Sequence, residues 1–387
     1  MICPMTVGGA LKALTRGLLA AAAVACALPA AAEPMFLSRQ YARCTTCHYS
    51  ATGGGLLTPY GRSLSQEEVS TWKGKAHAGP AGGATGEQAF LWGLFGDNLG
   101  GFSAGIDLRP SHVDVRLPRG AKETRTFMMN ADLTVAFQAK GWTAYGEIGR
   151  QPRDSGHDID SYEHWIGYRS EKGLNVRAGR FFPAYGIRFA DHTSYSRRPL
   201  GFDTFDQVYA LEVGYSGEKH LTQVSIGPGY ADAVLHDDGR QSFTATGRFQ
   251  WDLTPRTVLV VSGLWRDRSD LTPRTTATGL AFGFAPFSRL SIWTEADAEF
   301  QDGTPGAPVY TVANETSFEV FRGVWLKFSP QIRTAPGDTS GGSVRTAFEL
   351  NLFPRTHFNL GVSYYRDSAR VGDFVVKTLL AQLHLYL

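Results

Sequence analysis

The sequence predicts an all-β protein: an antiparallel outer-membrane β-barrel of about sixteen strands, preceded by a small N-terminal segment. Three observations support this prediction. From about residue 90 onward, apolar and polar residues alternate in segment after segment. Short turns alternate with longer polar loops, as they do in outer-membrane barrels. Aromatic residues gather near the ends of the predicted strands, where a membrane barrel places its interface girdles.

The composition excludes several classes of protein. The chain has 387 residues, with 38 Lys and Arg against 36 Asp and Glu. A nucleic-acid-binding domain normally presents a basic face, so no nucleic-acid partner is expected. Beyond the N-terminal leader there is no run of about eighteen apolar residues, which excludes a membrane-spanning helix. The alternating strands of a barrel contain no such run, so a barrel stays compatible with this composition.

The alternation itself separates a barrel from a soluble sandwich or propeller. In the segment 290–299 one face is mainly apolar, whereas the other carries Glu295, Asp297 and Glu299. Core strands of a sandwich would not regularly pair an apolar face with a charged one. A water-filled lumen accepts these charges, and with Glu147, Glu163 and Glu349 they are expected to form its ordinary polar lining. Binding of an incoming cation is the alternative role for these carboxylates.

The connections show the second pattern. Short turns are expected at 170–173, 321–323 and 354–355, and longer polar loops at 151–160, 190–204 and 334–343. Outer-membrane barrels have short turns on the periplasmic side and long loops outside. Arg197 and Arg198, within the loop 190–204, suit an anion.

Residues 1–32 are expected to be a signal peptide that is removed on export. Lys12 and Arg16 supply a positive region, 17–28 form a short apolar run, and 29–32 offer the small residues of a cleavage site. A lipid-modified Cys26 at the start of the mature chain is the alternative. The mature protein therefore lies outside the cytoplasm, and only two of its cysteines remain.

Those two cysteines stand in Cys44-Thr45-Thr46-Cys47-His48, which is the spacing that attaches a c-type haem. Two thiols at this spacing form thioethers to the two vinyl groups of one porphyrin, and the adjacent His48 is the proximal ligand of the haem iron. A thioredoxin-like dithiol would need a βαβ context, and a zinc site would need further ligands nearby. The sequence therefore predicts one covalent c-type haem.

The distal iron ligand is left open by the sequence. His77 lies in a Gly- and Pro-rich stretch that could fold back onto the haem, and it is the first candidate. Met35 and a histidine from the rest of the chain are the alternatives. Tyr60 and Arg62 are candidates for hydrogen bonds to the haem propionates, although a turn role for Pro59-Tyr60-Gly61 explains them equally well. The propionates are also an alternative to a free anion as the partner of Arg197 and Arg198.

The chain divides into four parts on this interpretation: the signal peptide 1–32, a monohaem cytochrome segment 33–73, a Gly/Ala-rich linker 74–87 and a porin-like barrel 88–387. The haem segment carries few apolar groups, so it could not bury a core by itself. A barrel of about sixteen strands has an opening wide enough to admit it. We expect the segment to form a plug within or at the mouth of the barrel.

The residues around the haem motif resemble the fused monohaem cytochrome–porins of iron-oxidising bacteria. In that family a Phe and an Arg-Gln pair precede the motif, here Phe36 and Arg39-Gln40, and an aromatic-Gly-Arg follows it, here Tyr60-Gly61-Arg62. The order of leader, haem segment and barrel also matches. The residue-level match is confined to roughly thirty positions. The segment 49–55 and the linker depart from it, which leaves the particular electron donor open.

The resemblance implies an electron carrier of the bacterial outer membrane rather than a conventional enzyme. Electrons would pass from an extracellular reductant, with ferrous iron as one candidate and iron oxidation as the implied activity, to a periplasmic cytochrome or another carrier. Outer-membrane lipid would surround the barrel. Two alternatives belong to other classes: a diffusion porin with a structural or sensory haem, and a haem enzyme held at the outer membrane.

Overall fold

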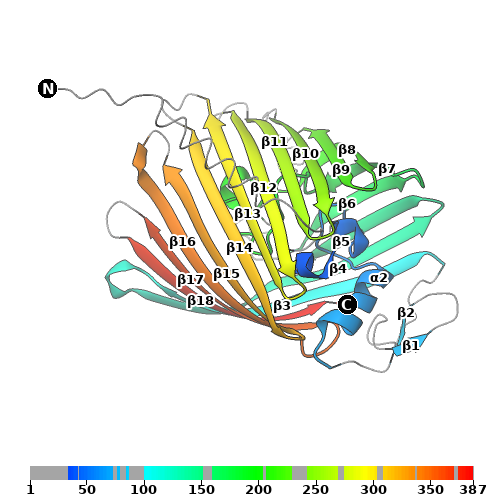
Figure 1. The fold of residues 1–387 in the computed structure, drawn as a ribbon, viewed down its shortest axis with the longest axis horizontal. Helices are drawn as coiled ribbons and strands as arrows, with labels where there is room; N and C mark the ends of the chain where they lie inside the picture. Colours follow the sequence, from blue (N-terminus) through cyan, green and yellow to red (C-terminus); the bar gives the residue numbers. More distant parts are fainter. Residues whose placement is uncertain are drawn as a thin grey trace.

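The computed structural model describes residues 34–41, 43–72, 76–78, 84–86, 100–150, 159–203, 206–228, 242–268, 274–302, 308–335, 338–369 and 374–386. Sixteen of its strands form one closed barrel in which every neighbouring pair is antiparallel (Figure 1). β18 pairs with β3 from Lys377–Arg116 to Tyr386–Asp107, and this pairing closes the barrel. The predicted fold class and strand number are confirmed.

The barrel strands are 8 to 18 residues long. Each strand pairs with the strands before and after it in the sequence, and β18 pairs with β3. The strands are β3 (Phe102–Arg116), β4 (Lys122–Ala139), β5 (Trp142–Arg150), β6 (Asp160–Arg169), β7 (Leu174–Phe181), β8 (Val208–Ser216), β9 (His220–Gly227), β10 (Ser242–Thr254), β11 (Thr257–Arg268), β12 (Thr275–Phe287), β13 (Leu290–Gln301), β14 (Val309–Phe321), β15 (Val324–Ala335), β16 (Asp338–Leu352), β17 (Phe358–Ala369) and β18 (Val375–Tyr386).

The outer face of the barrel is apolar, as the alternation predicts. On β8, Leu211, Val213 and Tyr215 are exposed, whereas Glu212 between them is buried. A closed barrel satisfies its backbone hydrogen bonds internally, and an exposed apolar face then belongs in lipid rather than in water. The barrel therefore spans the outer membrane, and this confirms the predicted location. Among the described residues no helix is long and apolar enough to cross a membrane.

The two ends of the barrel differ in their connections. Seven connections of two to five residues form one end, beginning with residues 140–141 between β4 and β5, and the chain enters β3 and leaves β18 at this end. The longest connection at the other end is 182–207, between β7 and β8. The predicted loop at 334–343 is wrong in extent, because Ser343 pairs with Arg333 and Ala335 pairs with Asp338, so that most of it is strand.

The N-terminal segment 34–72 lies inside the barrel at the short-turn end (blue in Figure 1). It contains a 3₁₀ turn η1 (Pro34–Arg39), a second one η2 (Cys44–Thr46), the helix α2 (Pro59–Leu64) and a π-helical turn η3 (Ser65–Val69). The predicted linker 74–87 holds two short paired strands, β1 (Ala76–Ala78) and β2 (Ala84–Gly86). Residues 1–33 and 88–99 lie outside the described residues.

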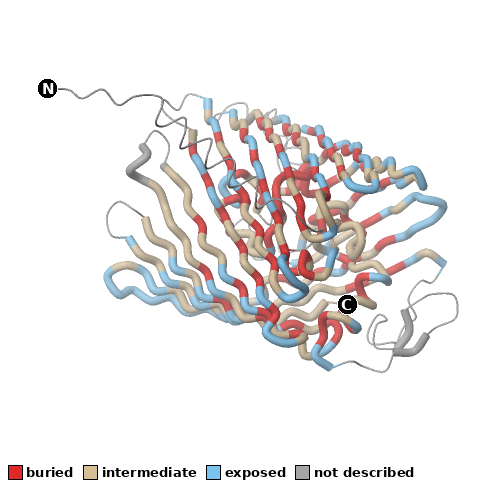
Figure 2. Tube along the Cα trace, viewed as in Figure 1, coloured by how far each residue is buried: buried red, intermediate tan, exposed pale blue. Residues whose placement is uncertain are grey.

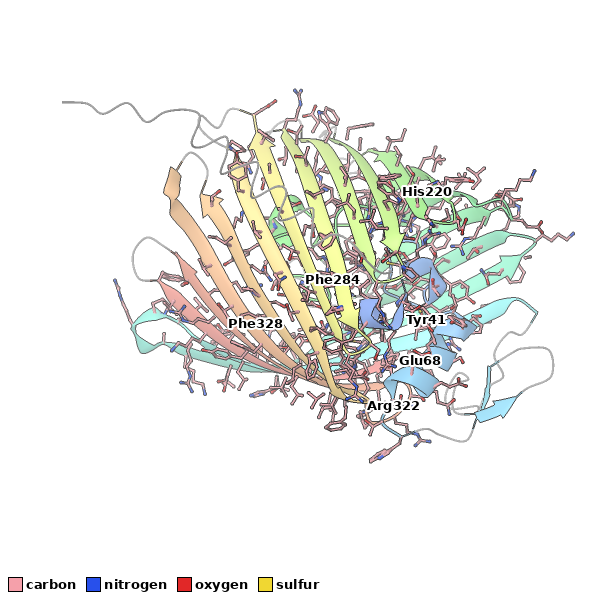
Figure 3. All side chains as sticks on the ribbon, in the orientation of Figure 1. Tyr41, Glu68, His220, Phe284, Arg322 and Phe328 are labelled. Carbon is pink, nitrogen blue, oxygen red and sulfur yellow. The ribbon has the colours of Figure 1, made fainter. Side chains whose placement is uncertain are left out.

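Backbone contacts fasten this segment to the rim of the barrel. The Thr71 and Trp72 amides donate to the carbonyls of Phe353 and Pro354, in the turn between β16 and β17. The Arg322 guanidinium, in the turn between β14 and β15, donates to the carbonyls of Ser70 and Gln66. Figure 3 labels Arg322 beside Glu68 of the segment at this mouth. The segment is thus a plug, as expected.

The apolar core of the molecule lies within the lumen. Leu37 of the plug and Ile187 and Phe189 of the connection 182–207 pack against lumen-facing residues of β11–β14, among them Val258, Val260 and Trp293. Figure 2 shows the result: buried residues alternate along β10–β14, whereas β16–β18 are mostly intermediate or exposed. One half of the lumen is therefore packed and the other half is open.

Candidate functional site

Cys44, Cys47 and His48 form a tight turn of the plug. The Cys47 amide donates to the Cys44 carbonyl at 3.1 Å and the His48 amide donates to the same carbonyl at 2.8 Å. His48 then forms an isolated β-bridge with Leu57, so the chain returns alongside the motif. Gly61 in α2 packs against this turn, since a Cβ there would lie 2.4 Å from the Cys47 carbonyl oxygen. The backbone therefore fixes both thiols and the imidazole close together.

The return of the chain depends on three successive glycines. Gly53, Gly54 and Gly55 have φ values of +79°, +76° and +59°, which only glycine adopts without cost. A Cβ at Gly53 would lie 3.2 Å from Cys44 Sγ, and one at Gly55 would lie 2.1 Å from the Tyr145 hydroxyl of β5. The glycine-rich stretch that departs from the family pattern is thus the closing part of the motif's own loop.

The His48 side chain is held in its neutral form. Burial, assisted by the positive charge of Arg188, lowers the pKa of His48 to about 4, although the nearby backbone of Gly54 and Gly55 acts in the opposite direction. Its Nδ1 is buried and makes no hydrogen bond of normal geometry with the described residues. A neutral imidazole is the form that ligates a metal ion.

These residues border a cavity of about 760 Å³ inside the lumen. Cavities that hold cofactors and other small molecules have roughly 300–1,000 Å³. Its lining includes the sulfur-bearing Cys44 and Cys47, His48, the buried Met35 and eight cationic side chains, among them Arg43, Arg188 and Arg248. Two thiols, a neutral imidazole, a cavity and cations that suit two carboxylates fit a c-type haem.

Arg188 connects this site to the connection 182–207. Its guanidinium donates to the Thr52 and Gly53 carbonyls and lies 4.6 Å from the centre of the Phe182 ring. A Cβ at Gly54 would approach the same guanidinium to 2.9 Å. Nothing in the local sequence distinguishes Arg188 from other loop arginines, so sequence reasoning missed it.

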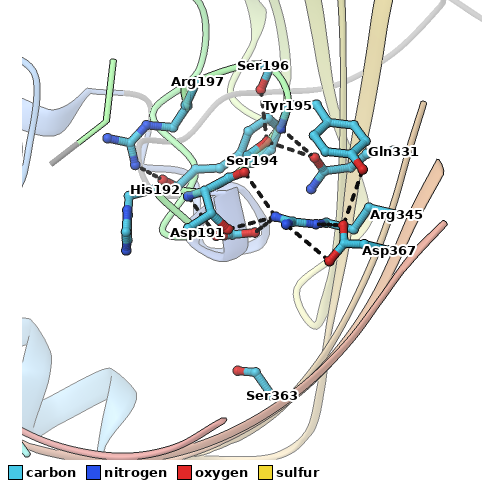
Figure 4. A network of polar contacts seen from close by, with 12 residues as sticks. Asp191, His192, Ser194, Tyr195, Ser196, Arg197, Gln331, Arg345, Ser363 and Asp367 are labelled. Carbon is cyan, nitrogen blue, oxygen red and sulfur yellow. Dashed lines mark hydrogen bonds and ion pairs between the residues drawn. The ribbon is translucent and has the colours of Figure 1, made fainter. Parts of the chain in front are cut away.

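The long connection is itself anchored across the lumen (Figure 4). Arg345 of β16 donates to Asp191 and to the Thr193 carbonyl and hydroxyl, and Gln331 of β15 accepts from the Ser194 hydroxyl and the Tyr195 amide. On the other side the Ile187 amide donates to Glu295 and the Tyr185 hydroxyl donates to Asp297 at 2.9 Å. The loop is therefore a fixed wall of the cavity.

The lumen carboxylates of β13 have a structural role, as predicted, but they do not line a water-filled space. Glu295, Asp297 and Glu299 are 1%, 3% and 2% exposed, so they are not part of a wet surface. The loop and the plug cover this part of β13, a coverage that no pattern within β13 reveals. Glu295 and Asp297 hold the loop, and Glu299 pairs with Arg333 at 2.8 Å.

Arg197 and Arg198, which suit an anion or the haem propionates by sequence, both line the cavity. Arg197 is buried and donates to the Phe189 and Phe202 carbonyls, and Arg198 pairs with Asp203. Arg62 is buried and donates to the Ala104 carbonyl, and Tyr60 is 51% exposed beside Tyr41. Neither Tyr60 nor Arg62 is among the described residues that line the cavity. Their propionate roles stay predictions.

Of the candidates for the distal ligand, Met35 lines the cavity and His77 belongs to β1. The His77 side chain lies outside the described part of the structure, so its ligand role also stays a prediction. His192 and His384 are the other histidines that line the cavity. The described part of the lumen therefore contains several candidates for the distal ligand of the haem iron.

Comparison with known proteins supports the barrel. No family model and no curated protein sequence matches the chain. OprB of Pseudomonas putida has a TM-score of 0.59 at 9% identity, over 74% of this chain and 94% of that one. A loop-deletion mutant of OmpT, an outer membrane protein of Vibrio cholerae, has 0.56 at 10%, over 74% and 100%. An anion-selective porin from Comamonas acidovorans has 0.56 at 8%, over 74% and 99%. At such identities the likeness establishes a porin-like fold alone.

Proposed function

We propose that the protein is an outer-membrane cytochrome–porin that carries electrons from an extracellular reductant, with ferrous iron as the first candidate, to a periplasmic electron carrier. The observation that carries this proposal is the position of Cys44, Cys47 and His48 on the wall of a cavity inside a membrane barrel. The membrane separates the two soluble partners. A redox group inside the lumen is the arrangement that can serve both.

A c-type haem bound to this chain would supply a one-electron redox centre whose potential depends on its ligands and burial. The residues of the chain have separate roles toward it. Cys44 and Cys47 would hold it covalently, and His48 would provide a neutral Nε2 to the iron. Arg43, Arg188 and Arg248, which line the cavity, would orient its carboxylates.

The open half of the lumen provides access to this site. The cavity extends from His48 to lumen-facing residues of β17, β18 and β3, among them Thr378 and Ser363. A small reductant would enter the cavity from the long-loop end, which faces outward in such barrels. The plug, fastened to the turns at the other end, places the cysteines near the periplasmic side.

The same open half favours one alternative, a diffusion porin in which the haem is structural or sensory. The two functions differ in their response to a reductant. The conduit requires that a reductant changes the oxidation state of the haem, whereas the porin requires only solute flux. No described group near the motif requires the third function, a haem enzyme.

Reduced-minus-oxidised absorbance spectra of outer membranes that contain the chain test the proposal. The wild type should show a c-type α-band that develops when ferrous iron is added. Cys44→Ala/Cys47→Ala, produced at equal barrel level, should show none. A band that no extracellular reductant changes would contradict the electron conduit and favour the porin. Absence of a band in the wild type would contradict the proposal that the chain binds a haem.

A further inference from the structure

The short-turn end of the barrel carries a ring of positive charge. Each of its seven turns contains one lysine or arginine, and only two of them contain an acidic residue, Glu171 or Glu218. The seven basic residues, hereafter the basic ring, are Lys140, Lys172, Lys219, Arg256, Arg289, Arg322 and Arg355. Turn composition alone explains polar residues here, but it does not explain one cation in every turn.

The basic ring is available to a partner. Lys140, Lys172, Lys219, Arg289 and Arg355 are exposed, and Arg256 and Arg322 are half-buried. Among the described residues, none of Lys140, Lys172, Lys219 and Arg289 lies within ion-pair distance of an acidic side chain. All seven turns lie within the described part of the chain. The described residues therefore do not neutralise the charges of these four side chains, whereas Arg322 is close to the carboxylates of Glu319, Glu68 and Glu67.

The opposite end of the barrel has no such excess. The eight connections there contain eight arginines and eleven aspartates by sequence. Several of those arginines are also paired, as Arg198 is with Asp203 and Arg274 with Asp302. The positive charge is thus a property of the short-turn end, where it creates a field that reaches about 8 Å into physiological salt.

The basic ring surrounds the exposed part of the plug. Arg322 belongs to the ring and also binds the Ser70 and Gln66 carbonyls, and the turn of Lys219 accepts hydrogen bonds from Arg43, next to Cys44. Tyr60 of the plug is 51% exposed, and Trp72, whose amide binds the Pro354 carbonyl of the rim, is 69% exposed. Exposed aromatic side chains together with a charged rim are typical of a protein–protein interface.

We infer that the short-turn end is a docking face for a soluble electron carrier with an acidic surface around its redox group. This inference rests on the proposed function, since it specifies the chemistry of the periplasmic acceptor. The basic ring attracts and orients the acidic surface, and Tyr60 and Trp72 provide the short-range contact. The docked carrier then lies over the plug, at the end of the lumen that holds Cys44.

Binding can be measured without identifying the natural carrier. Mitochondrial cytochrome c in its native, basic form and in its succinylated, acidic form has the same fold with opposite charge. The full chain in phosphatidylcholine nanodiscs should bind the succinylated form at least about tenfold more tightly at low ionic strength, and the preference should shrink at physiological salt. Equal affinity for both forms would overturn the inference.

Two variants locate the face. Lys140→Gln/Lys172→Gln/Lys219→Gln/Arg289→Gln should weaken binding of the succinylated form about tenfold and flatten its salt dependence. Trp72→Ala should weaken binding while leaving the salt dependence unchanged. The matched control Arg119→Gln/Lys122→Gln/Arg198→Gln/Arg274→Gln, at the long-loop end, should bind like the wild type. A ring variant that binds like the wild type would contradict the inference.

Two further arms separate the competing explanations. If the ring variant alters only the preference for phosphatidylglycerol over phosphatidylcholine nanodiscs, the ring belongs to lipid and the docking face is wrong. The haem-free variant Cys44→Ala/Cys47→Ala should bind the succinylated form normally. In the wild type, normal binding together with absent electron transfer would remove the proposed function and leave the docking face intact, so the two failures are distinguishable.

Discussion

The two halves of the lumen differ although the same kind of strand lines both. Along β10–β14 the inward-facing side chains are covered by the plug and by residues 182–207, and even Glu295 and Glu299 are buried. Along β16–β18 most inward-facing side chains keep contact with the open lumen, as Thr378 does. The barrel wall alone therefore does not determine which part of the lumen is open. The plug and residues 182–207, which fold into the lumen, determine it.

Removing the plug should produce the largest change in this comparison. Deletion of residues 34–72 is expected to raise single-channel conductance in planar bilayers severalfold. The packed half would then be covered only by residues 182–207, and the short-turn mouth would be open. Thr378→Trp, which adds a large side chain to the open half, is expected to lower conductance. Equal conductance of the deletion variant and the wild type would contradict the plug.

A buried ion pair of β7 and β8 should contribute more to stability than a partly exposed pair on the open side of the lumen. Arg177 and Glu212 are each 5% exposed and are joined at 2.8 Å. Arg177→Met leaves Glu212 buried and unpaired, which should lower the free energy of unfolding by about 3–5 kcal/mol. Arg109→Met removes a partly exposed pair with Asp107, which keeps His384 as a second partner, so the loss should be smaller. Urea unfolding in detergent measures both, and equal losses would contradict the comparison.

The link between the loop and the motif should have an intermediate effect. Arg188→Gln removes charge-assisted hydrogen bonds to Thr52 and Gly53 that are each worth about 1.5–3 kcal/mol. Hydrogen exchange should therefore increase at residues 52–55, and the haem potential should fall because a nearby cation is lost. Arg274→Gln, which does not line the cavity, is the control that should change neither quantity. Unchanged exchange in Arg188→Gln would show that the loop does not hold the motif.

The smallest effect concerns the glycine turn. Gly55→Ala should destabilise the plug by about 1–3 kcal/mol, because a Cβ at a φ of +59° would also meet the Tyr145 hydroxyl. Gly120 has a φ of +85°, and a Cβ there would have no neighbouring atom within 4 Å. Gly120→Ala therefore measures the backbone cost without the steric cost. Thermal unfolding of the two variants gives the difference, which should vanish if the plug does not pack against β5.

The sequence predicts the barrel well because each strand shows its own alternation of apolar and polar residues. The cysteine–histidine motif can also be recognised from the sequence, because its residues are adjacent in the chain. The covering of the packed half involves residues far apart in the chain, such as Leu37, Ile187 and Val258. One local signal was present: Val258, Leu259, Val260 and Val261 are apolar on both faces of β11, which is typical of a strand buried on both sides. Arg188 gave no such signal.

Electron transfer across a membrane tests the central claim most directly. The chain is reconstituted into liposomes that enclose an oxidised redox protein, and ferrous iron is added outside. The wild type should reduce the enclosed protein, and Cys44→Ala/Cys47→Ala, inserted at equal density, should not. Equal reduction by both chains would show that the barrel admits iron without any role for the motif, and it would contradict the electron conduit.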